Sequence, residues 1–230
     1  MAKKLVKKRK IRVFRFLLVL LILGFFALGV YLFINDNIKN IIIENTTYLN
    51  DDYIIEQAEI KDYPSFWLTS TKGIEEKLGK SPYIKKVNVK RKFYNVLAIE
   101  IDENLPLFMY EGDQTVIFEN KEKVKVEEEI EIFRIPRLMN YVPDDKYDSL
   151  IKGLKKIDKD ILGKVSEMTY TPNEYDKDRF LLYMDDGNSV YLTLTKFRML
   201  NYYNKVLTQL EGKKGILYLD NGNHFQIMEW

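Results

Sequence analysis

The chain has no cysteine and a single histidine, His224, among its 230 residues. The lack of cysteine excludes disulfides, cysteine nucleophiles and cysteine-based metal sites. A single histidine excludes a histidine-rich metal cage and the HExxH zinc site. The chain also lacks a Walker A loop, a GxGxxG loop and a GxSxG nucleophile turn. The sequence therefore predicts no enzyme, no cofactor and no small-molecule substrate.

Two alternatives to this prediction involve acidic residues. The segments Asp185–Asn188 and Asp220–Asn223 have calcium-binding residue types, but they lack the alternate spacing and closing glutamate of an EF-hand loop. We interpret both as turns and predict no metal site. A wall-active hydrolase with paired carboxylates stays open, because the distance between two carboxylates is not visible in a sequence.

The chain has only one long hydrophobic run, Phe16–Ile34, which carries no charged residue. As a helix it would measure about 28 Å, close to the thickness of a bilayer core. A signal peptide is the alternative, but it would have a shorter apolar region and a small-residue cleavage site. The run ends instead in Tyr31-Leu32-Phe33-Ile34-Asn35. We therefore expect an uncleaved membrane anchor that spans the membrane once.

The charges of the chain are divided unevenly around this run. Residues 1–15 contain eight basic residues and no acidic residue, which leaves 28 basic against 34 acidic residues in the rest of the chain. The positive-inside rule predicts a cytoplasmic N-terminus and extracytoplasmic C-terminal domains. We call residues 1–15 the basic head, and we expect electrostatic attraction between it and anionic lipid headgroups. Because the body has a net charge of about −6, the sequence does not predict a nucleic-acid-binding protein.

Residues 36–104 predict a compact α+β unit. A strand at Ile38–Glu44 precedes two short helices, the first capped within residues 50–52 and the second starting near Ser70 or Thr71. Two strands with alternating apolar residues follow at Ile84–Lys90 and Val96–Asp102. Their basic and acidic outer faces predict cross-strand pairs. The helices are expected on one face of this small sheet.

The order strand, helix, helix, strand, strand is that of a POTRA domain. This order follows directly after the apolar run. Together with the stretch SPYIKKVNVKRKFYNVLAIEIDENLP, it resembles the FtsQ/DivIB family of bacterial cell-division proteins. Two positions depart from the family pattern. Tyr94 stands in a turn where proline is usual, and Glu44-Asn45 stands where Gly-Asn is frequent.

Residues 105–230 resemble the second, mixed α/β domain of that family, called the β domain. We expect a hairpin at 116–126, one helix running from Pro143 to Gly163, and a strand at Val165–Thr171. The segment Asp185–Asn188 predicts a hairpin turn between strands 180–184 and 189–194. A helix at Lys196–Leu210 and antiparallel strands at 216–219 and 223–228 complete the domain.

The last strand, NHFQIMEW, carries large apolar residues on both faces. Phe225 and Ile227 are expected in the core, which leaves Met228 and Trp230 on the outer face as an interface. Trp230 could instead fold back over its own core. A terminal strand is also a natural sheet edge, open to pairing with an incoming strand. In the family, the last strands and the helix before them receive a partner subunit. The resemblance therefore implies a partner-binding surface made of Arg198, Tyr202, Tyr218, His224, Gln226, Met228 and Trp230.

The resemblance implies a non-enzymatic scaffold of the septal cell-division complex. It would be anchored in the cell membrane at the division septum and bind FtsL-like and DivIC/FtsB-like proteins through its extracytoplasmic domains. The alternative is an anchored POTRA-type subunit of envelope assembly or secretion that binds extended polypeptides. The two differ in selectivity, because a scaffold binds one partner tightly and an assembly subunit binds many peptides weakly.

Overall fold

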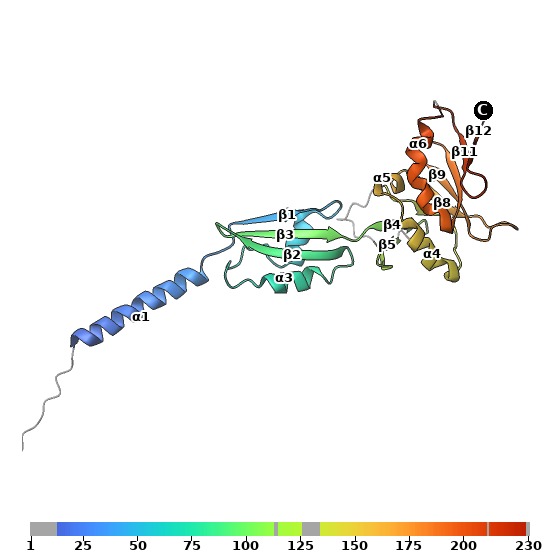
Figure 1. Ribbon diagram of the computed structural model, residues 1–230. Helices are drawn as coiled ribbons and strands as arrows, with labels where there is room; N and C mark the ends of the chain where they lie inside the picture. The colour runs from blue at the N-terminus through green and yellow to red at the C-terminus, as the bar shows by residue number, and fades with distance from the viewer. Residues whose placement is uncertain (1–12, 113–114, 126–133, 211, 229–230) are drawn as a thin grey trace, which may run out of the picture.

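The computed structural model describes residues 13–112, 115–125, 134–210 and 212–228. Helix α1, Val13–Ile34, projects away from the first unit, with only its C-terminal end close to that unit (Figure 1). Its segment Phe14–Ile34 is long and apolar enough to cross a membrane, and none of it is buried. The predicted apolar helix at 16–34 is therefore confirmed as a helix, whereas residues 1–12 of the basic head lie outside the described residues.

The first unit after α1 is a three-stranded sheet with two helices. It contains β1 (Asn40–Glu44), α2 (Asp51–Gln57), α3 (Thr71–Leu78), β2 (Ile84–Lys92) and β3 (Val96–Glu103). The strand order is β1-β3-β2, with β1 parallel and β2 antiparallel to β3. The element order predicted from the sequence is confirmed.

Side-chain caps explain where the two helices begin. The Asn50 side chain accepts a hydrogen bond from the amide of Tyr53 at 2.7 Å, and Ser70 accepts one from Gly73 at 3.1 Å. On the open face of the sheet, Lys90 lies 3.1 Å from Glu100, as the charge pattern of the two strands predicts.

The second sheet contains nine strands in the described part of the chain. They are β4 (Pro106–Tyr110), β5 (Thr115–Phe118), β6 (Lys123–Lys125), β7 (Arg137–Leu138), β8 (Val165–Tyr170), β9 (Arg179–Met184), β10 (Ser189–Thr193), β11 (Gly215–Tyr218) and β12 (His224–Ile227). Their order is β12-β11-β10-β9-β8-β7-β4-β5-β6. Strands β4 and β7 were not predicted. The α+β fold class and the antiparallel pairing of the last two strands are confirmed.

In the described residues, four helical segments accompany this sheet: α4 (Asp144–Leu154), α5 (Lys159–Leu162), the 3₁₀ helix η1 (Leu194–Tyr202) and α6 (Tyr203–Leu207). The prediction of a single helix from Pro143 to Gly163 is wrong, because the helix is interrupted between α4 and α5. The side chain of Asn201 binds the exposed backbone there. It accepts from the Asp158 amide at 3.0 Å and donates to the Lys156 carbonyl at 3.1 Å.

The α-helix predicted at Lys196–Leu210 is also corrected. Its first part is 3₁₀, and only Tyr203–Leu207 is α-helical. The buried residues Leu194, Phe197, Leu200 and Tyr203 recur every three positions. That spacing matches the three residues per turn of a 3₁₀ helix, so this geometry directs all four side chains to the sheet.

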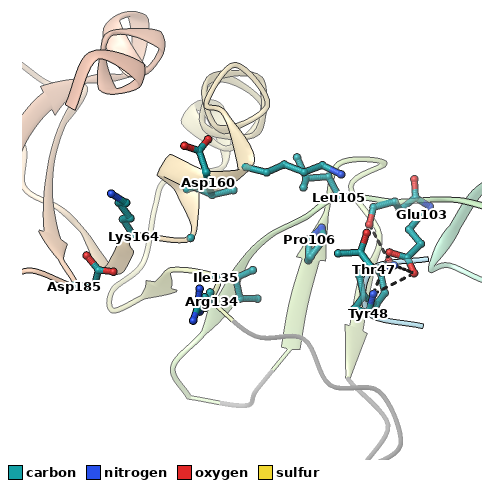
Figure 2. Close-up of a pocket in the computed structure, with 14 residues that line it drawn as sticks. Thr47, Tyr48, Glu103, Leu105, Pro106, Arg134, Ile135, Asp160, Lys164 and Asp185 are labelled. Carbon is teal, nitrogen blue, oxygen red and sulfur yellow. Dashed lines mark hydrogen bonds between the residues drawn. The ribbon is translucent and has the colours of Figure 1, made fainter. Parts of the chain in front are cut away.

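Two carboxylates, Glu103 and Glu119, lie at the junction of the two units. Glu103, at the end of β3, accepts hydrogen bonds from the amides of Thr47 and Leu49 at 2.9 Å and from Tyr48 at 3.2 Å. Figure 2 shows this cluster on one wall of a cavity whose other wall carries Asp160, Lys164 and Asp185 of the second unit. Because Glu103 is buried and already bound to three amides, we assign it a structural role.

Glu119, directly after β5, connects three parts of the chain. Its carboxylate accepts from Lys85 of β2 at 2.9 Å and lies 3.6 Å from Lys155, just after α4. Burial raises the pKa of Glu119, but the hydrogen bonds from Lys85 and the Leu105 amide, with the charges of both lysines, outweigh burial and lower the pKa overall. Phe118, the neighbouring residue, packs in the core of the first unit. The hairpin β4–β5 therefore belongs to both units structurally.

Candidate partner-binding surface

Strand β12 forms one edge of the nine-stranded sheet. It pairs antiparallel with β11, and no other strand of the described residues pairs with it. The turn between them is built by short polar residues, since the Asp220 carboxylate accepts from the amide of Asn221 at 2.8 Å. Gly222 follows with a φ of +83°, which favours glycine. The predicted edge position is confirmed.

The register shows which backbone groups of β12 face outward. The amide of Met228 donates to the Lys214 carbonyl at 3.0 Å, so residues 228, 226 and 224 face β11. Antiparallel strands alternate their hydrogen-bonding direction from one residue to the next. The backbone N–H and C=O groups of Phe225 and Ile227 therefore point to the open edge, where an incoming strand could pair.

Gly215 brings the two strands together at the end of β11. A Cβ atom at this position would lie 2.0 Å from the carbonyl oxygen of Gln226, closer than any side chain allows. The Gly215 amide donates to the buried side chain of Asn188 at 2.9 Å. A glycine is therefore required at position 215 for β12 to pair with β11.

A row of stacked side chains crosses the last four strands on the face opposite η1. The ring of Tyr191 on β10 stacks on Tyr218 of β11 at 5.4 Å between centroids, and Tyr218 stacks on His224 of β12 at 4.7 Å. The guanidinium of Arg179 on β9 lies 3.6 Å from the centroid of Tyr191. We call Arg179, Tyr191, Tyr218 and His224 the aromatic ladder.

The sheet register explains the ladder. Tyr191 is the direct partner of Tyr218, and Tyr218 is the direct partner of His224. Their sequence neighbours Leu192 and Leu217 are buried in the core beneath η1. Because side chains alternate between faces along a strand, the three rings share the other face.

Charges fix the inner end of the ladder. Arg179 Nε lies 2.7 Å from the carboxylate of Asp220, with 18% and 10% of the two side chains exposed. Lys196 donates to the backbone carbonyl of Asp220 at 2.9 Å. The guanidinium is therefore held between a carboxylate and an aromatic face, which restricts its orientation.

Three of the residues implied by the resemblance meet at the outer end of the ladder. Tyr218 and His224 are ladder members, and the Tyr218 hydroxyl donates to Gln226 Oε1 at 3.3 Å. Met228 follows β12 and is half-buried. His224 and Gln226 are exposed. This group presents two ring faces and one amide beside the open backbone of β12.

Ile227 was expected in the core, and this prediction is wrong. Its side chain is 49% exposed, whereas Phe225 packs against the core as predicted. Ile227 pairs with Gly215, which has no side chain to cover it. Glu229 and Trp230 lie outside the described residues, so the two interpretations of Trp230 both stay predictions.

Arg198 and Tyr202 lie elsewhere. Both are exposed on η1, which packs on the opposite face of the sheet from the ladder. Arg198 borders a shallow hollow with Lys156, Asp158 and Asn201, near the break between α4 and α5. The structure therefore does not bring these two residues together with Tyr218, His224 and Gln226.

Arg179 and Tyr191 were not predicted as members of this surface. A signal existed for Tyr191, which stands between the core residues Val190 and Leu192 on a strand of period two. Arg179 carried no comparable signal, since its partners Tyr191 and Asp220 are distant in sequence. The described residues contain no group of three or more metal-ligating side chains.

Comparison with known proteins identifies both units. Residues 37–104 match the model of the POTRA domain, FtsQ-type, and residues 112–221 match that of the C-terminal domain of cell division protein FtsQ/DivIB. The chain is 27% identical over 197 residues to cell division protein DivIB of Bacillus cytotoxicus, covering 84% of this chain and 77% of that protein. It is 25% identical over 231 residues to DivIB of Bacillus subtilis, covering 97% and 88%.

A solved structure of the major extracytoplasmic domain of DivIB from Geobacillus stearothermophilus is also similar. The match has 24% identity and a TM-score of 0.37, and it covers 48% of this chain and 96% of that chain. The two family matches follow one another along the chain in the order seen in its two units. The chain therefore belongs to the FtsQ/DivIB family of cell-division proteins.

Proposed function

We propose that this chain is a non-enzymatic scaffold of the division complex at the septum, anchored once in the cell membrane. Residues 16–34 would span the membrane, the basic head would stay in the cytoplasm, and residues 36–104 and 105–230 would form two extracytoplasmic domains. The apolar helix α1 and the eight basic residues before its core support this orientation. The partners would be the FtsL-like and DivIC/FtsB-like proteins of the same cell.

The free edge of β12 beside the aromatic ladder carries this proposal. An incoming partner strand would pair with the outward backbone groups of Phe225 and Ile227, which supplies affinity by β-augmentation. Tyr218, His224 and Gln226 would contact the side chains of that strand and supply specificity. Aromatic residues in such a position are typical of binding hot spots.

Substitution of Ile227 tests backbone pairing separately from side-chain contact. Ile227→Pro removes the outward amide, and proline is tolerated on an edge strand where the N–H faces solvent. Ile227→Ala removes nearly the same side chain but keeps the amide. Both cores begin at Ile38 or later, so a fragment of residues 36–230 retains them and suits calorimetry or analytical ultracentrifugation with the partner ectodomains.

The expected result is that Ile227→Pro weakens partner binding at least about tenfold, equal to about 1.4 kcal/mol, while Ile227→Ala has a smaller effect. Circular dichroism should show that both variants stay folded. Equal affinity of the proline variant and the parent would refute β-augmentation at β12. Weak binding of many unrelated extended peptides, with no tight complex with the division proteins, would favour the envelope-assembly alternative.

A further inference from the structure

The POTRA domain exposes large apolar side chains at the end nearest α1. Phe93 and Tyr94, at the tip of the β2–β3 hairpin, are 91% and 88% exposed, and Trp67 and Leu68, in the α2–α3 connection, are 47% and 61% exposed. Phe93, Tyr94 and Trp67 line one common hollow. We call these four residues the juxtamembrane patch. Solvent-exposed apolar groups of this kind mark interaction surfaces.

Both loops of the patch are tied to the residues that directly follow α1. The Asp36 carbonyl accepts from the amide of Phe66 at 2.8 Å, and its carboxylate accepts from the Trp67 indole at 3.2 Å. The side chain of Asn95 donates to the carbonyl of Asn37 at 3.0 Å. The patch is therefore held within a few residues of Ile34, the last residue of α1, as Figure 1 shows for the hairpin tip.

Contacts between rings extend the connection into the helix itself. Trp67 stacks on Phe33, in the last turn of α1, with 5.4 Å between centroids. Arg91 fixes the Trp67 loop to β2, since its guanidinium donates to the carbonyls of Phe66 at 3.1 Å and Thr69 at 2.6 Å. These contacts hold the Trp67 loop and the hairpin tip together beside the last turn of α1.

The backbone of the tip also presents its rings outward. Tyr94 and Asn95 have φ values of +63° and +58°, a conformation that is uncommon for residues other than glycine. Asn95 is held there by the bond from its side chain to Asn37 and by its own carbonyl, which accepts from Lys39 at 2.9 Å. Tyr94 has no such bond among the described contacts, so its conformation places a large ring on the protein surface without an internal contact that requires it.

We propose that the juxtamembrane patch inserts into the headgroup region on the extracytoplasmic face of the cell membrane and docks the POTRA domain on the lipid surface. Tryptophan and tyrosine prefer this region because they combine an apolar ring with a polar group. The inference rests on the membrane anchoring proposed above, which places the end of α1 at that interface. Docking fixes the direction of the POTRA sheet, and the edge strand β12 then lies at the far end of the molecule (Figure 1).

Bromolipid quenching of a single tryptophan tests the docking. The two native tryptophans are replaced by Trp67→Phe, which keeps a ring beside Phe33, and Trp230→Phe. Tyr94→Trp then reports on the hairpin tip, and Tyr175→Trp, at a residue that is 96% exposed in the β8–β9 loop, is the matched control. The full chain is reconstituted in nanodiscs of phosphatidylcholine and phosphatidylglycerol, with and without bromine near the headgroups.

The expected result is strong quenching and a blue-shifted emission for the Tyr94→Trp probe and no quenching for the Tyr175→Trp probe. Adding Phe93→Ser should reduce the quenching at position 94, because the neighbouring apolar anchor is lost. Stable incorporation into nanodiscs with equal, absent quenching at both positions overturns the docking while leaving the anchor intact. Failure of the chain to incorporate at all refutes the anchor, and with it the docking. Quenching that appears only when partner proteins are added also overturns docking by the patch itself.

Discussion

Replacing Arg179 by methionine should lower the free energy of unfolding of the C-terminal domain by about 3 kcal/mol. Arg179 Nε lies 2.7 Å from the Asp220 carboxylate, and both side chains are largely buried. Charge centres about 4 Å apart attract each other by roughly 4 kcal/mol at an effective dielectric constant near 20. Desolvation offsets part of this energy, which leaves a coupling of about 2 kcal/mol. The guanidinium over the Tyr191 ring adds about 1 kcal/mol.

A double-mutant cycle measures this coupling. It combines Arg179→Met with Asp220→Asn, whose amide keeps the size and one acceptor of the carboxylate. Native-state hydrogen exchange of amides in β9, β10 and β11 restricts the measurement to the C-terminal sheet, so the unfolding of the POTRA domain does not interfere. A coupling below about 0.5 kcal/mol, typical of exposed pairs, would refute the reasoning that burial makes this pair important.

Two further predictions concern the junction. Glu103→Ala should destabilise the POTRA domain by about 3 kcal/mol, because the buried amide of Leu49 and the partly buried amides of Thr47 and Tyr48 lose their acceptor. Glu103→Gln keeps an oxygen and should lower the free energy of unfolding in urea by less. The lowered pKa of Glu119 means that its carboxylate stabilises the fold above its ordinary pKa of 4.5, and that this stability is lost as pH falls through the folded-state pKa. The difference in melting temperature between the parent and Glu119→Gln should therefore shrink between pH 7 and pH 3. Equal destabilisation by both Glu103 variants, or a pH-independent difference for Glu119→Gln, would contradict these assignments.

Local patterns in the sequence determined the elements that are stabilised by contacts between residues close to one another in the sequence. The apolar run specified α1, because a helix satisfies its own backbone and needs no partner segment. The period-two strands around residues 93–95 and around Gly187 specified their hairpins, since register and turn are set within about twenty residues. The caps Asn50 and Ser70 are likewise local interactions.

Tertiary contacts decided the elements that the sequence misassigned. The apolar stripe from Tyr147 to Ile161 has helical spacing, yet Asn201, more than forty residues away, provides hydrogen bonds that make a break after α4 favourable. The segment before Tyr203 follows a three-residue spacing because it packs on a sheet formed by distant strands. Such choices depend on partners that no local window contains.

The candidate surface illustrates the same division. The sequence alone placed an apolar, edge-forming strand at 223–228, because alternation and the turn before it are local. Only the sheet order brought Arg179, Tyr191 and Tyr218 into one row with His224, since pairing between strands that are separated in the sequence sets which side chains stand opposite one another. The exposure of Ile227 likewise followed from its pairing with Gly215. The burial of a side chain depends on the residue opposite it on the neighbouring strand as well as on the residue itself.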